Sequence, residues 1–443
     1  MKIEFETKVM NNLKYIFCLI LLFGGNMMYA TKVYTLQQCV DTAMNNNRNV
    51  KQQELNRQSK EIAYEQARMD LLPNLNASAG QSFTMGRSLT ADNTYKSVNS
   101  SQSSFNVSSN LTLFDGLKMK YNIDAKKAEM QASEYDVEKI KSDIELNVTV
   151  AFLQVLLYKE NLNTQESQIE LTQQKIEQKT ALVNSGKLPE GELYELKAQL
   201  AKEEFNIIQA ENNLKLAKLD LAQIIELKDF EDFDVEKAEG EIDTETMILS
   251  ADEVYKSAVQ HRPEIKGAEY RLISYQKTSD IARSAYYPTL SLGAQMGSGY
   301  YNLKGVPNDS FNKQLNDNLS SHVGLNLNIP IFNRFEIKNR VQNSKLAIES
   351  SRLEIENAKY ELRKKIEQAY QNALAAQARY QAAQKSEIAT REAFRYAEQK
   401  YEAERASVYE LYQAKSTLTL VLSELSQSKY EFILRVKVLE LLK

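Results

Sequence analysis

The stretch "LLPNLNASAG" (residues 71–80) decides the fold, because the chain changes its backbone periodicity there. A proline disfavours helical geometry in the residue before it, so the helix that leads to Pro73 has to end at this point. Apolar and small polar residues then alternate, which is typical of a β-strand with one apolar face. The stretch "YYPTLSLGAQ" (286–295) makes the same change around Pro288, 215 positions later. The sequence therefore predicts one helix-to-strand transition that is made twice.

The two transitions belong to a repeat that covers most of the chain. An offset of 215 also aligns "LQQCVDTAMNNNRNVKQQELN" (36–56) with "ADEVYKSAVQHRPEIKGAEYR" (251–271). At an offset of 218, "LTLFDGLKMKYNI" (111–123) pairs with "LNIPIFNRFEIKNRV" (327–341). The tripeptide "YEL" then recurs at 194–196 and 409–411, again at an offset of 215. Such long-range self-similarity indicates an internal duplication.

The duplication divides the chain into three parts after its N-terminal residues. We predict a first structural repeat over 31–227 and a second over 251–443. Between them, 228–250 is an acidic linker that could add a small equatorial element. Each repeat is expected to contain a helix (36–70 in the first), two strands and a very long helical hairpin. The strands are expected at about 74–86, 103–114, 289–301 and 320–332, joined by polar loops.

The long helices dominate the predicted fold. No helix breaker occurs from Gly116 to Asn184, which at ~1.5 Å per residue gives a rod of about 100 Å. The turns "NSGKLPEGE" (184–192) and "YEAERAS" (401–407) lead into return helices that end near Leu227 and Leu442. Apolar residues recur every seven positions, which indicates left-handed coiled packing. They are Ile123, Met130, Val137, Ile144 and Ala151 in the first repeat, and Val341, Ile348, Ile355, Leu362, Ala369 and Ala376 in the second.

Four strands per chain cannot close a barrel, since about eight is the minimum. Open strand edges in a membrane would leave backbone groups unsatisfied, so further copies of the chain would have to complete the sheet. Two copies give a filled barrel and three give an open bore, which the small polar residues Asn76, Ser78, Ser108 and Ser291 favour. The alternative is a soluble sandwich whose polar face meets water.

The N-terminal residues have the features of an export signal. Lys8 and Lys14 precede an apolar run too short to span a bilayer, and Ala30 stands at a plausible cleavage point. We expect residues 1–30 to be a cleaved signal peptide without lipidation, although Met10 could equally be the true start.

Cys39 alone remains after cleavage of the signal peptide, which excludes an intramolecular disulfide. The net charge of −4 argues against a nucleic-acid partner.

The duplicated order of elements resembles that of TolC-like outer-membrane efflux proteins, the outer membrane factors of tripartite export systems. The resemblance rests on the "LLPNL" and "YYPTL" strand entries and the "LTLFDG" and "IPIFNR" strand exits, and it covers essentially the whole mature chain. It implies a mainly α fold with a membrane β-barrel portion. A homotrimer would form a twelve-strand barrel in the outer membrane of a Gram-negative bacterium and a twelve-helix tunnel across the periplasm.

The resemblance also implies a function and partners. The trimer would be a passive exit duct for small molecules such as drugs, surrounded by outer-membrane lipid. It would work with a periplasmic adaptor (a membrane fusion protein) and an inner-membrane pump that is proton-driven (RND) or ATP-driven (ABC). Two alternatives remain open: the same duct could serve type I protein secretion or metal export, or the chain could be a periplasmic coiled-coil scaffold without a pore.

Family members narrow at the periplasmic tip, and the resemblance places candidate pore residues there. Glu410 falls where the family often has an acidic ring residue, and Glu195 is its counterpart in the first repeat. Gln413 departs from the pattern, because a second acid can occupy that position. Converging carboxylates would favour cations and let protonation bias a closed tip. The alternative is a solvated helix face in a charge-rich chain.

Further residues near the tip are candidates for packing and docking. Tyr409 and Tyr194 could bridge neighbouring coils, and packing is the preferred interpretation. The turns around Gly186 and Pro189, and around Glu404 to Ala406, would be the docking surface for the adaptor.

The sequence argues against an enzyme. His261 and His322 lie in different predicted elements, without cysteines or carboxylates at metal-ligand spacing. A phosphate-binding glycine loop and a nucleophile elbow are both missing. We therefore expect no catalytic site, cofactor or metal, and the missing Met, His and Cys clusters weaken the metal-export alternative.

Overall fold

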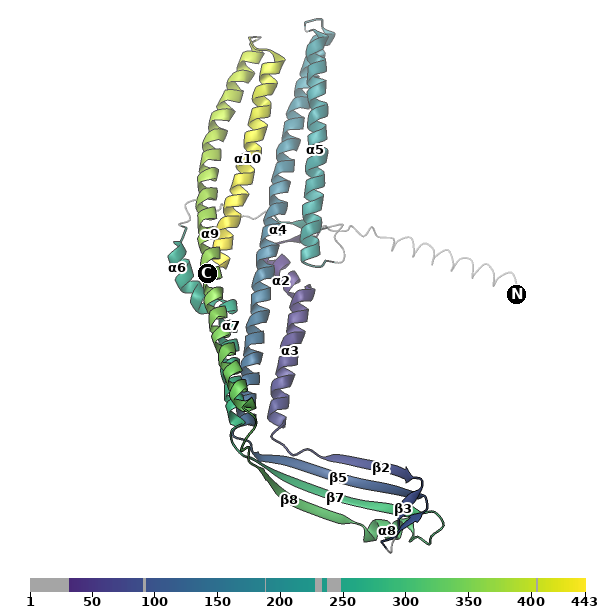
Figure 1. The fold of residues 1–443 in the computed structure, drawn as a ribbon. Helices are drawn as coiled ribbons and strands as arrows, with labels where there is room; N and C mark the ends of the chain where they lie inside the picture. The colour runs from purple at the N-terminus through teal and green to yellow at the C-terminus, as the bar shows by residue number, and fades with distance from the viewer. Residues whose placement is uncertain (1–31, 91–92, 188, 228–232, 237–247, 404) are drawn as a thin grey trace, which may run out of the picture. The chain divides into compact units, whose positions relative to one another are not determined.

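The computed structural model describes residues 32–90, 93–187, 189–227, 233–236, 248–403 and 405–443 (Figure 1). They form two compact units that share the long helices α4 (Lys118–Asn184) and α9 (Glu336–Glu402). One unit combines the described parts of 1–46, 147–246 and 378–434, and the other combines those of 47–146, 247–377 and 435–443. The predicted signal peptide, most of the acidic linker and Glu404 lie outside the described residues, so predictions about them stay predictions.

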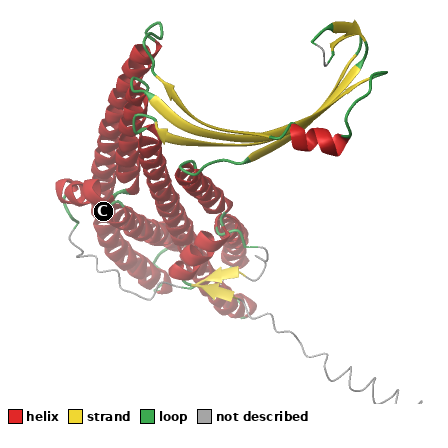
Figure 2. Cartoon of the chain, turned by 90° about the horizontal axis from the view of Figure 1, so that it is seen from below, coloured by secondary structure: helices red, strands yellow, loops and turns green. Residues whose placement is uncertain are grey.

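The second unit contains a four-stranded antiparallel sheet in the order β2-β5-β7-β8 (Figures 1 and 2). Its register confirms the predicted alternation, because Leu111, Leu292 and Leu325 lie side by side on one face. Thr112, Ser291 and Asn326 form the neighbouring row, on the other face. The sheet therefore has one apolar and one polar face. The strands are β2 (Asn76–Thr84), β5 (Ser100–Phe114), β7 (Thr289–Leu303) and β8 (Ser320–Asn328).

Four helices of the second unit lie side by side: α3 (Arg48–Met69), the first part of α4, α7 (Pro263–Ser284) and the first part of α9. Lys60 joins α3 to α4 through Glu129, and Arg271 joins α7 to α4 through Asp136. The Ser344 hydroxyl on α9 donates to Ser279 on α7 at 2.9 Å. Residues of the predicted seven-residue repeats lie on the buried side of α4 and α9. The buried ones include Val137, Ile144, Ile355, Leu362 and Ala369.

A small cluster also belongs to the second unit. The helix α6 (Ala251–His261) buries Val254 and Ala258 against Leu362 and Leu439. Ser250 and Glu253 form a capping box, which fixes the start of α6.

The first unit contains the short helix α2 (Leu36–Asn46) and the return helices α5 (Glu190–Ile224) and α10 (Val408–Leu441). From Arg435 onward, α10 belongs to the second unit. Two short parallel strands, β1 (Lys32–Tyr34) and β6 (Phe233–Val235), pair beside them. The described part of the linker thus contributes one strand. Asp234 on β6 contacts Lys159 and Lys218, each at 3.0 Å. Burial opposes ionisation of Asp234, but the hydrogen bonds from both lysines hold its pKa below the ordinary value.

Several predicted boundaries are wrong. The helix expected over 36–70 is two helices, because the Asn47 side chain accepts the backbone N–H of Asn49 at 2.8 Å and starts α3 anew. The polar stretches expected to be loops contain β3 (Arg87–Leu89), β4 (Tyr95–Ser97) and α8 (Phe311–Asp317). These elements are too short to show a periodicity. Strand β5 begins at Ser100 rather than 103, and β8 ends at Asn328 rather than 332.

Candidate functional site at the tips of the two hairpins

The first hairpin turns between α4 and α5 at a glycine. Gly186 has φ +71°, in the left-handed region that glycine adopts without steric cost, and its N–H donates to the Val183 carbonyl at 2.9 Å. Pro189 then precedes α5, whose first turn carries Glu190 and Glu192. Carboxylates at this end interact favourably with the helix dipole. The turn is therefore specified by local chemistry on both sides.

The second hairpin turns without glycine or proline. Helix α10 begins beside Ser407, whose hydroxyl oxygen accepts the N–H of Glu410 at 3.2 Å. This is the role of an N-cap, and it explains how the helix starts at a defined residue. The backbone N–H of Arg405 donates to the Lys400 carbonyl at 2.8 Å and closes the end of α9.

The three predicted pore residues all lie on exposed faces of α5 and α10. Glu195, Glu410 and Gln413 are exposed, whereas their neighbours Leu196 and Leu411 are buried. Among the described residues, no hydrogen bond or ion pair joins these three side chains to one another. Their exposure leaves them available to a pore axis, but a single chain does not bring them together. A pore role stays a prediction.

The two predicted tip tyrosines are also exposed. Tyr194 is 64% exposed, with the Lys197 ammonium 5.4 Å from its ring centre, and Tyr409 is 72% exposed, so most of each ring is open to solvent within one chain. Packing of these rings would need a second copy of the chain, and it stays a prediction. Among the predicted docking residues, Gly186 and Pro189 are exposed and Ala406 is half-buried.

Sequence reasoning missed the polar contacts that join the first hairpin to α9. The Tyr401 hydroxyl donates to Glu192 at 3.2 Å, and the Lys179 ammonium lies 4.3 Å from the centre of the Tyr401 ring. Burial raises the pKa of Tyr401, and the Glu192 carboxylate raises it further. The Lys175 ammonium pairs with Glu398 at 2.7 Å. These contacts connect α4, α5 and α9 near the turns.

A buried lysine adds a second connection. The Lys415 ammonium on α10 donates to the Gln168 carbonyl at 2.8 Å, to Glu203 at 3.2 Å and to the Thr172 hydroxyl. Its side chain is 7% exposed and that of Glu203 is 8% exposed. Burial lowers the pKa of Lys415, and the Glu203 charge opposes this.

The Glu203 carboxylate is itself fully engaged. It accepts hydrogen bonds from Thr172 at 2.6 Å and from the Gln199 amide at 2.9 Å. All three ammonium hydrogens of Lys415 thus have acceptors, as a buried charge requires. The network joins α4, α5 and α10 around one desolvated ion pair.

The repeat contains a signal that could have predicted this pair. At the offset of 215, Lys415 corresponds to Leu200 and Glu203 corresponds to Leu418. A charge that replaces leucine at a seam position in only one repeat points to a buried partner rather than to a solvated face.

The described part of the chain shows no sign of a metal site. No group of three or more His, Cys, Asp or Glu side chains there could hold a metal ion. No described helix is both long and apolar enough to cross a bilayer.

The fold and the duplicated hairpins define a TolC-like channel protein. The model of the outer membrane efflux protein family matches residues 39–225 and 254–440, one match for each repeat. The chain belongs to the outer membrane efflux protein family, whose members are channels rather than enzymes. The predicted resemblance is therefore confirmed, and so is a mainly helical fold with a few strands that matches TolC-like channels; the membrane barrel, the trimer and the tunnel stay predictions.

Solved structures show the same fold. CusC is 16% identical with a TM-score of 0.76, over 92% of this chain and 91% of its own. VceC of Vibrio cholerae is 14% identical with a TM-score of 0.72, over 92% and 95%. CmeC of Campylobacter jejuni is 21% identical with a TM-score of 0.71, over 92% and 85%. A search of the curated proteins found no significant match.

Proposed function

We propose that this chain forms, as a homotrimer, the outer-membrane exit duct of a tripartite efflux system. One observation carries the proposal: the four-stranded sheet has one apolar face, and among the described residues its outer strands β2 and β8 each pair with a neighbour along one edge alone. On the apolar face of β8, Val323, Leu325 and Leu327 are between 59% and 70% exposed. A surface of this kind needs an apolar surrounding and further strands.

The lengths of the strands support closure by copies of the same chain. The outer strands β2 and β8 have nine residues each, whereas the inner strands β5 and β7 have 15. Beyond Ser320, where β8 begins, side chains occupy the edge of β7 that β8 does not cover. The Gln314 amide bonds the N–H and the carbonyl of Tyr301 at 2.9 and 3.0 Å, and Asn318 donates to the Gly299 carbonyl at 2.8 Å. The edges left for pairing are therefore equal in length.

The outer helices support the same conclusion. Leu55, Ile62 and Met69 on α3 are spaced by seven residues and are between 50% and 69% exposed. Leu346, Leu353 and Tyr360 on α9 have the same spacing and are between 59% and 69% exposed. The α9 stripe of one copy would pack against the α3 stripe of the next, a head-to-tail contact that closes into a ring. Three copies give twelve strands and an open bore.

The inner surface supports transport of small molecules without strong selectivity. The four long strands contain no Asp, Glu, Lys or Arg, and their polar face carries mainly Ser, Thr, Asn and Gln, with His322 opposite Gln295. The duct would open outward through this uncharged barrel. Glu410 would form an acidic ring at the other end, with Gln413 beside it and Glu195 as the matching residue of the first hairpin.

The partners follow from the family's place in tripartite systems. A periplasmic adaptor would dock at the turns that contain Gly186, Pro189, Glu404 and Ala406. Energy would come from an inner-membrane RND or ABC pump through that adaptor. The mature chain, freed of its signal peptide, would lie in the outer membrane and extend into the periplasm. Small molecules such as drugs are the proposed cargo, and secreted proteins or metal ions are the alternatives.

Conductance of the purified protein in planar bilayers tests the duct. We expect stepwise conductance with a preference for cations, and a weaker preference in Glu410→Gln. The matched control is Glu424→Gln, an exposed acid farther along α10 from the turn, which should leave ion selectivity unchanged. A protein that inserts no pores would refute the duct and favour a coiled-coil scaffold. A strain that lacks the gene and becomes sensitive to dyes, but not to metals, would support the proposed cargo.

A further inference from the structure

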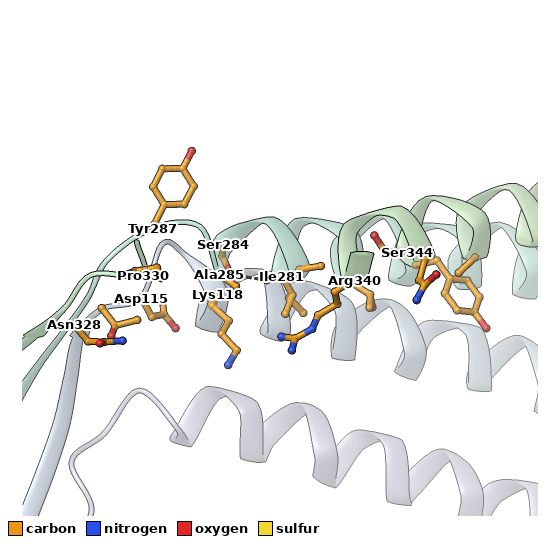
Figure 3. Close-up of a pocket in the computed structure, with 16 residues that line it drawn as sticks. Asp115, Lys118, Ile281, Ser284, Ala285, Tyr287, Asn328, Pro330, Arg340 and Ser344 are labelled. Atoms are coloured by element: carbon orange, nitrogen blue, oxygen red, sulfur yellow. Dashed lines mark hydrogen bonds between the residues drawn. The ribbon is translucent and has the colours of Figure 1, made fainter. Parts of the chain in front are cut away.

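A cavity of about 540 Å³ lies where the helices of the second unit meet the sheet (Figure 3). Its walls come from the turn between β5 and α4, from the end of α7, from the end of β8 and from the start of α9. The volume falls within the range of cavities that hold small organic ligands, about 300–1,000 Å³. None of the pore, packing or docking residues considered above lines it.

One side of the cavity is apolar. Ile281 and Ala282 on α7, Ala285 directly after it, Pro330 after β8 and Ala347 on α9 contribute side chains without polar atoms. Ala282 is buried, and the other four are half-buried, so the apolar floor is partly open to a ligand. A hydrocarbon or ring system placed there would be removed from water, which favours binding.

The other side carries two cations and two amides. Lys118 and Arg340 are exposed, and among the described residues the Lys118 ammonium makes no hydrogen bond or ion pair. Arg340 bonds Glu336 at 2.5 Å through one nitrogen, which leaves guanidinium N–H groups for a ligand. Asn328 and Asn343 also line the cavity. Figure 3 shows Lys118, Arg340 and Asn328 extending to the same side of the helix–sheet junction, whereas Tyr287 extends to the other.

The charge of the lining is positive. Its single carboxylate, Asp115, accepts the backbone N–H of Met119 at 2.9 Å and so is committed to the start of α4. Two cations and one carboxylate line the cavity, and Arg340 also pairs with Glu336 outside the lining. An anionic group between Lys118 and Arg340 would gain charge-assisted hydrogen bonds from both.

The cavity opens on the polar face of the wall. Thr289 and Asn328, which line it, are paired across β7 and β8, and the next pair, Leu290 and Leu327, lies on the apolar face. If the apolar face meets lipid, as the proposed duct requires, the cavity faces the bore. A solute in transit would reach it there, whereas a membrane lipid would not.

We propose that this cavity binds an amphipathic organic anion in the bore of the duct. The acid group would lie between Lys118 and Arg340, and the apolar body would lie on Ile281 and its neighbours. The proposal rests on the proposed function, because that function places the polar face inside. It deepens that function by naming organic anions as a class of cargo that the wall itself recognises.

Equilibrium dialysis tests the site with the full-length protein in nanodiscs of zwitterionic lipid. The probe is taurocholate, a steroid with a sulfonate group, and the comparison probe is CHAPS, which has a similar steroid body with a zwitterionic end. We expect saturable taurocholate binding that weakens at least tenfold in the double variant Lys118→Gln, Arg340→Gln and weakens with added salt. CHAPS binding should change by less than threefold.

The matched control is Lys120→Gln, which removes a cation from the same helix but outside the lining. It should bind taurocholate as the unmodified protein does. Ala347→Phe fills the cavity without changing charge and should weaken both probes. The site is refuted if the unmodified protein shows no saturable binding, or if Lys120→Gln weakens binding as much as the double variant. Competition by anionic phospholipid in the nanodisc, absent with zwitterionic lipid, would assign the site to membrane lipid and refute the bore location.

Bilayer conductance separates this proposal from the duct itself. Pores without taurocholate binding would refute the anion site and leave the duct intact. Taurocholate binding that depends on Lys118 and Arg340, in a protein that forms no pores, would refute the duct instead.

Discussion

The two strand-to-helix junctions follow the same backbone path with different residues. In the first repeat, Gly116 and Leu117 have φ +69° and +71°, and in the second, Arg334 and Phe335 have φ +53° and +63°. Each pair is 218 positions from its counterpart, so duplication has preserved two consecutive left-handed residues. A left-handed backbone conformation costs a non-glycine residue about 1–2 kcal/mol, and the second junction has this cost at Arg334.

The surroundings explain why only one junction has glycine. A Cβ atom on Gly116 would lie 2.7 Å from the Ser284 carbonyl oxygen and 2.8 Å from the Tyr287 Cβ atom. Glycine at the first junction is therefore required by close packing as well as by backbone geometry. The comparison teaches that the duplication conserves the chain path, whereas neighbouring elements select the residue.

The two helical hairpins also have the same backbone plan with different residues. Helices α4 and α9 have 67 residues each, so the rods are matched. The return helices differ at the seam, where Lys415 and Glu203 stand in place of the leucines found at the corresponding positions, Leu200 and Leu418. The ion pair makes one of two duplicated interfaces chemically distinct. A buried polar pair of this kind can fix which elements associate.

The largest expected effect is that of removing one member of this pair. Lys415→Ala leaves the Glu203 charge buried without an opposite charge beside it, which costs about 3–5 kcal/mol. The double variant Lys415→Leu, Glu203→Leu copies the leucines of the other repeat and should be neutral or stabilising. Thermal unfolding in detergent measures both. Equal destabilisation by the single and double variants would show that the unpaired Glu203 charge does not cause the loss of stability.

The next effect separates the two junctions. Gly116→Ala combines left-handed strain with two contacts shorter than 3.0 Å, and we expect a loss of about 3 kcal/mol in unfolding free energy. Gly186→Ala, with φ +71° but no atom within 4 Å of the added Cβ, should lose only about 1 kcal/mol. Denaturant midpoints of the two variants give the comparison. Similar losses would mean that packing around Gly116 does not select glycine.

A smaller effect of opposite sign is expected at the second junction. Arg334→Gly relieves left-handed strain but increases the freedom of the unfolded chain, so it should stabilise by no more than about 1 kcal/mol. The same denaturant measurement serves, with Arg352→Gly as a control within helix α9, where glycine should destabilise. A marked loss of stability in Arg334→Gly would show that the arginine side chain contributes a contact of its own.

The smallest effect concerns a feature of the first repeat alone. Asp234 contacts Lys159 and Lys218, whose counterparts in the second repeat are Gln377 and Ile433. The pKa of Asp234 is lowered below its ordinary 3.8, so its stabilisation is complete above that value and is lost as the pH falls through the lower, folded-state pKa. Asp234→Asn should cost about 1 kcal/mol at neutral pH and remove this acid-dependent part. Unfolding between pH 2 and 5 checks it, and an unchanged pH profile would contradict the assignment.

Much of the fold was predictable because its signals extend over long stretches. The prolines at 73 and 288 mark the same helix end in both repeats, and the period-two and period-seven patterns each extend over many residues. The structure confirms the strands and the long helices that these signals predict. Asn47 starts the new helix α3 through one side-chain hydrogen bond, and α8 has seven residues, so neither leaves a periodic signal. Single local interactions of this kind are not visible in a pattern.

The site was less predictable than the fold. Sequence position placed Glu195 and Glu410 on exposed faces near the turns, but only a second and third copy could bring such residues together. The buried Lys415 was not predicted, because its partners Gln168, Thr172 and Glu203 are distant in sequence and meet it only through packing. Comparing each seam residue with the residue at the corresponding position of the other repeat would have revealed the buried ion pair.

The most direct test of the account is the mass of the protein extracted from the outer membrane in mild detergent. The account predicts a trimer, which Leu353→Asp on the exposed α9 stripe should dissociate and Arg352→Asp beside it should not. A monomer or dimer recovered without detergent would contradict the barrel, and the open edges of β2 and β8 would then need a different partner.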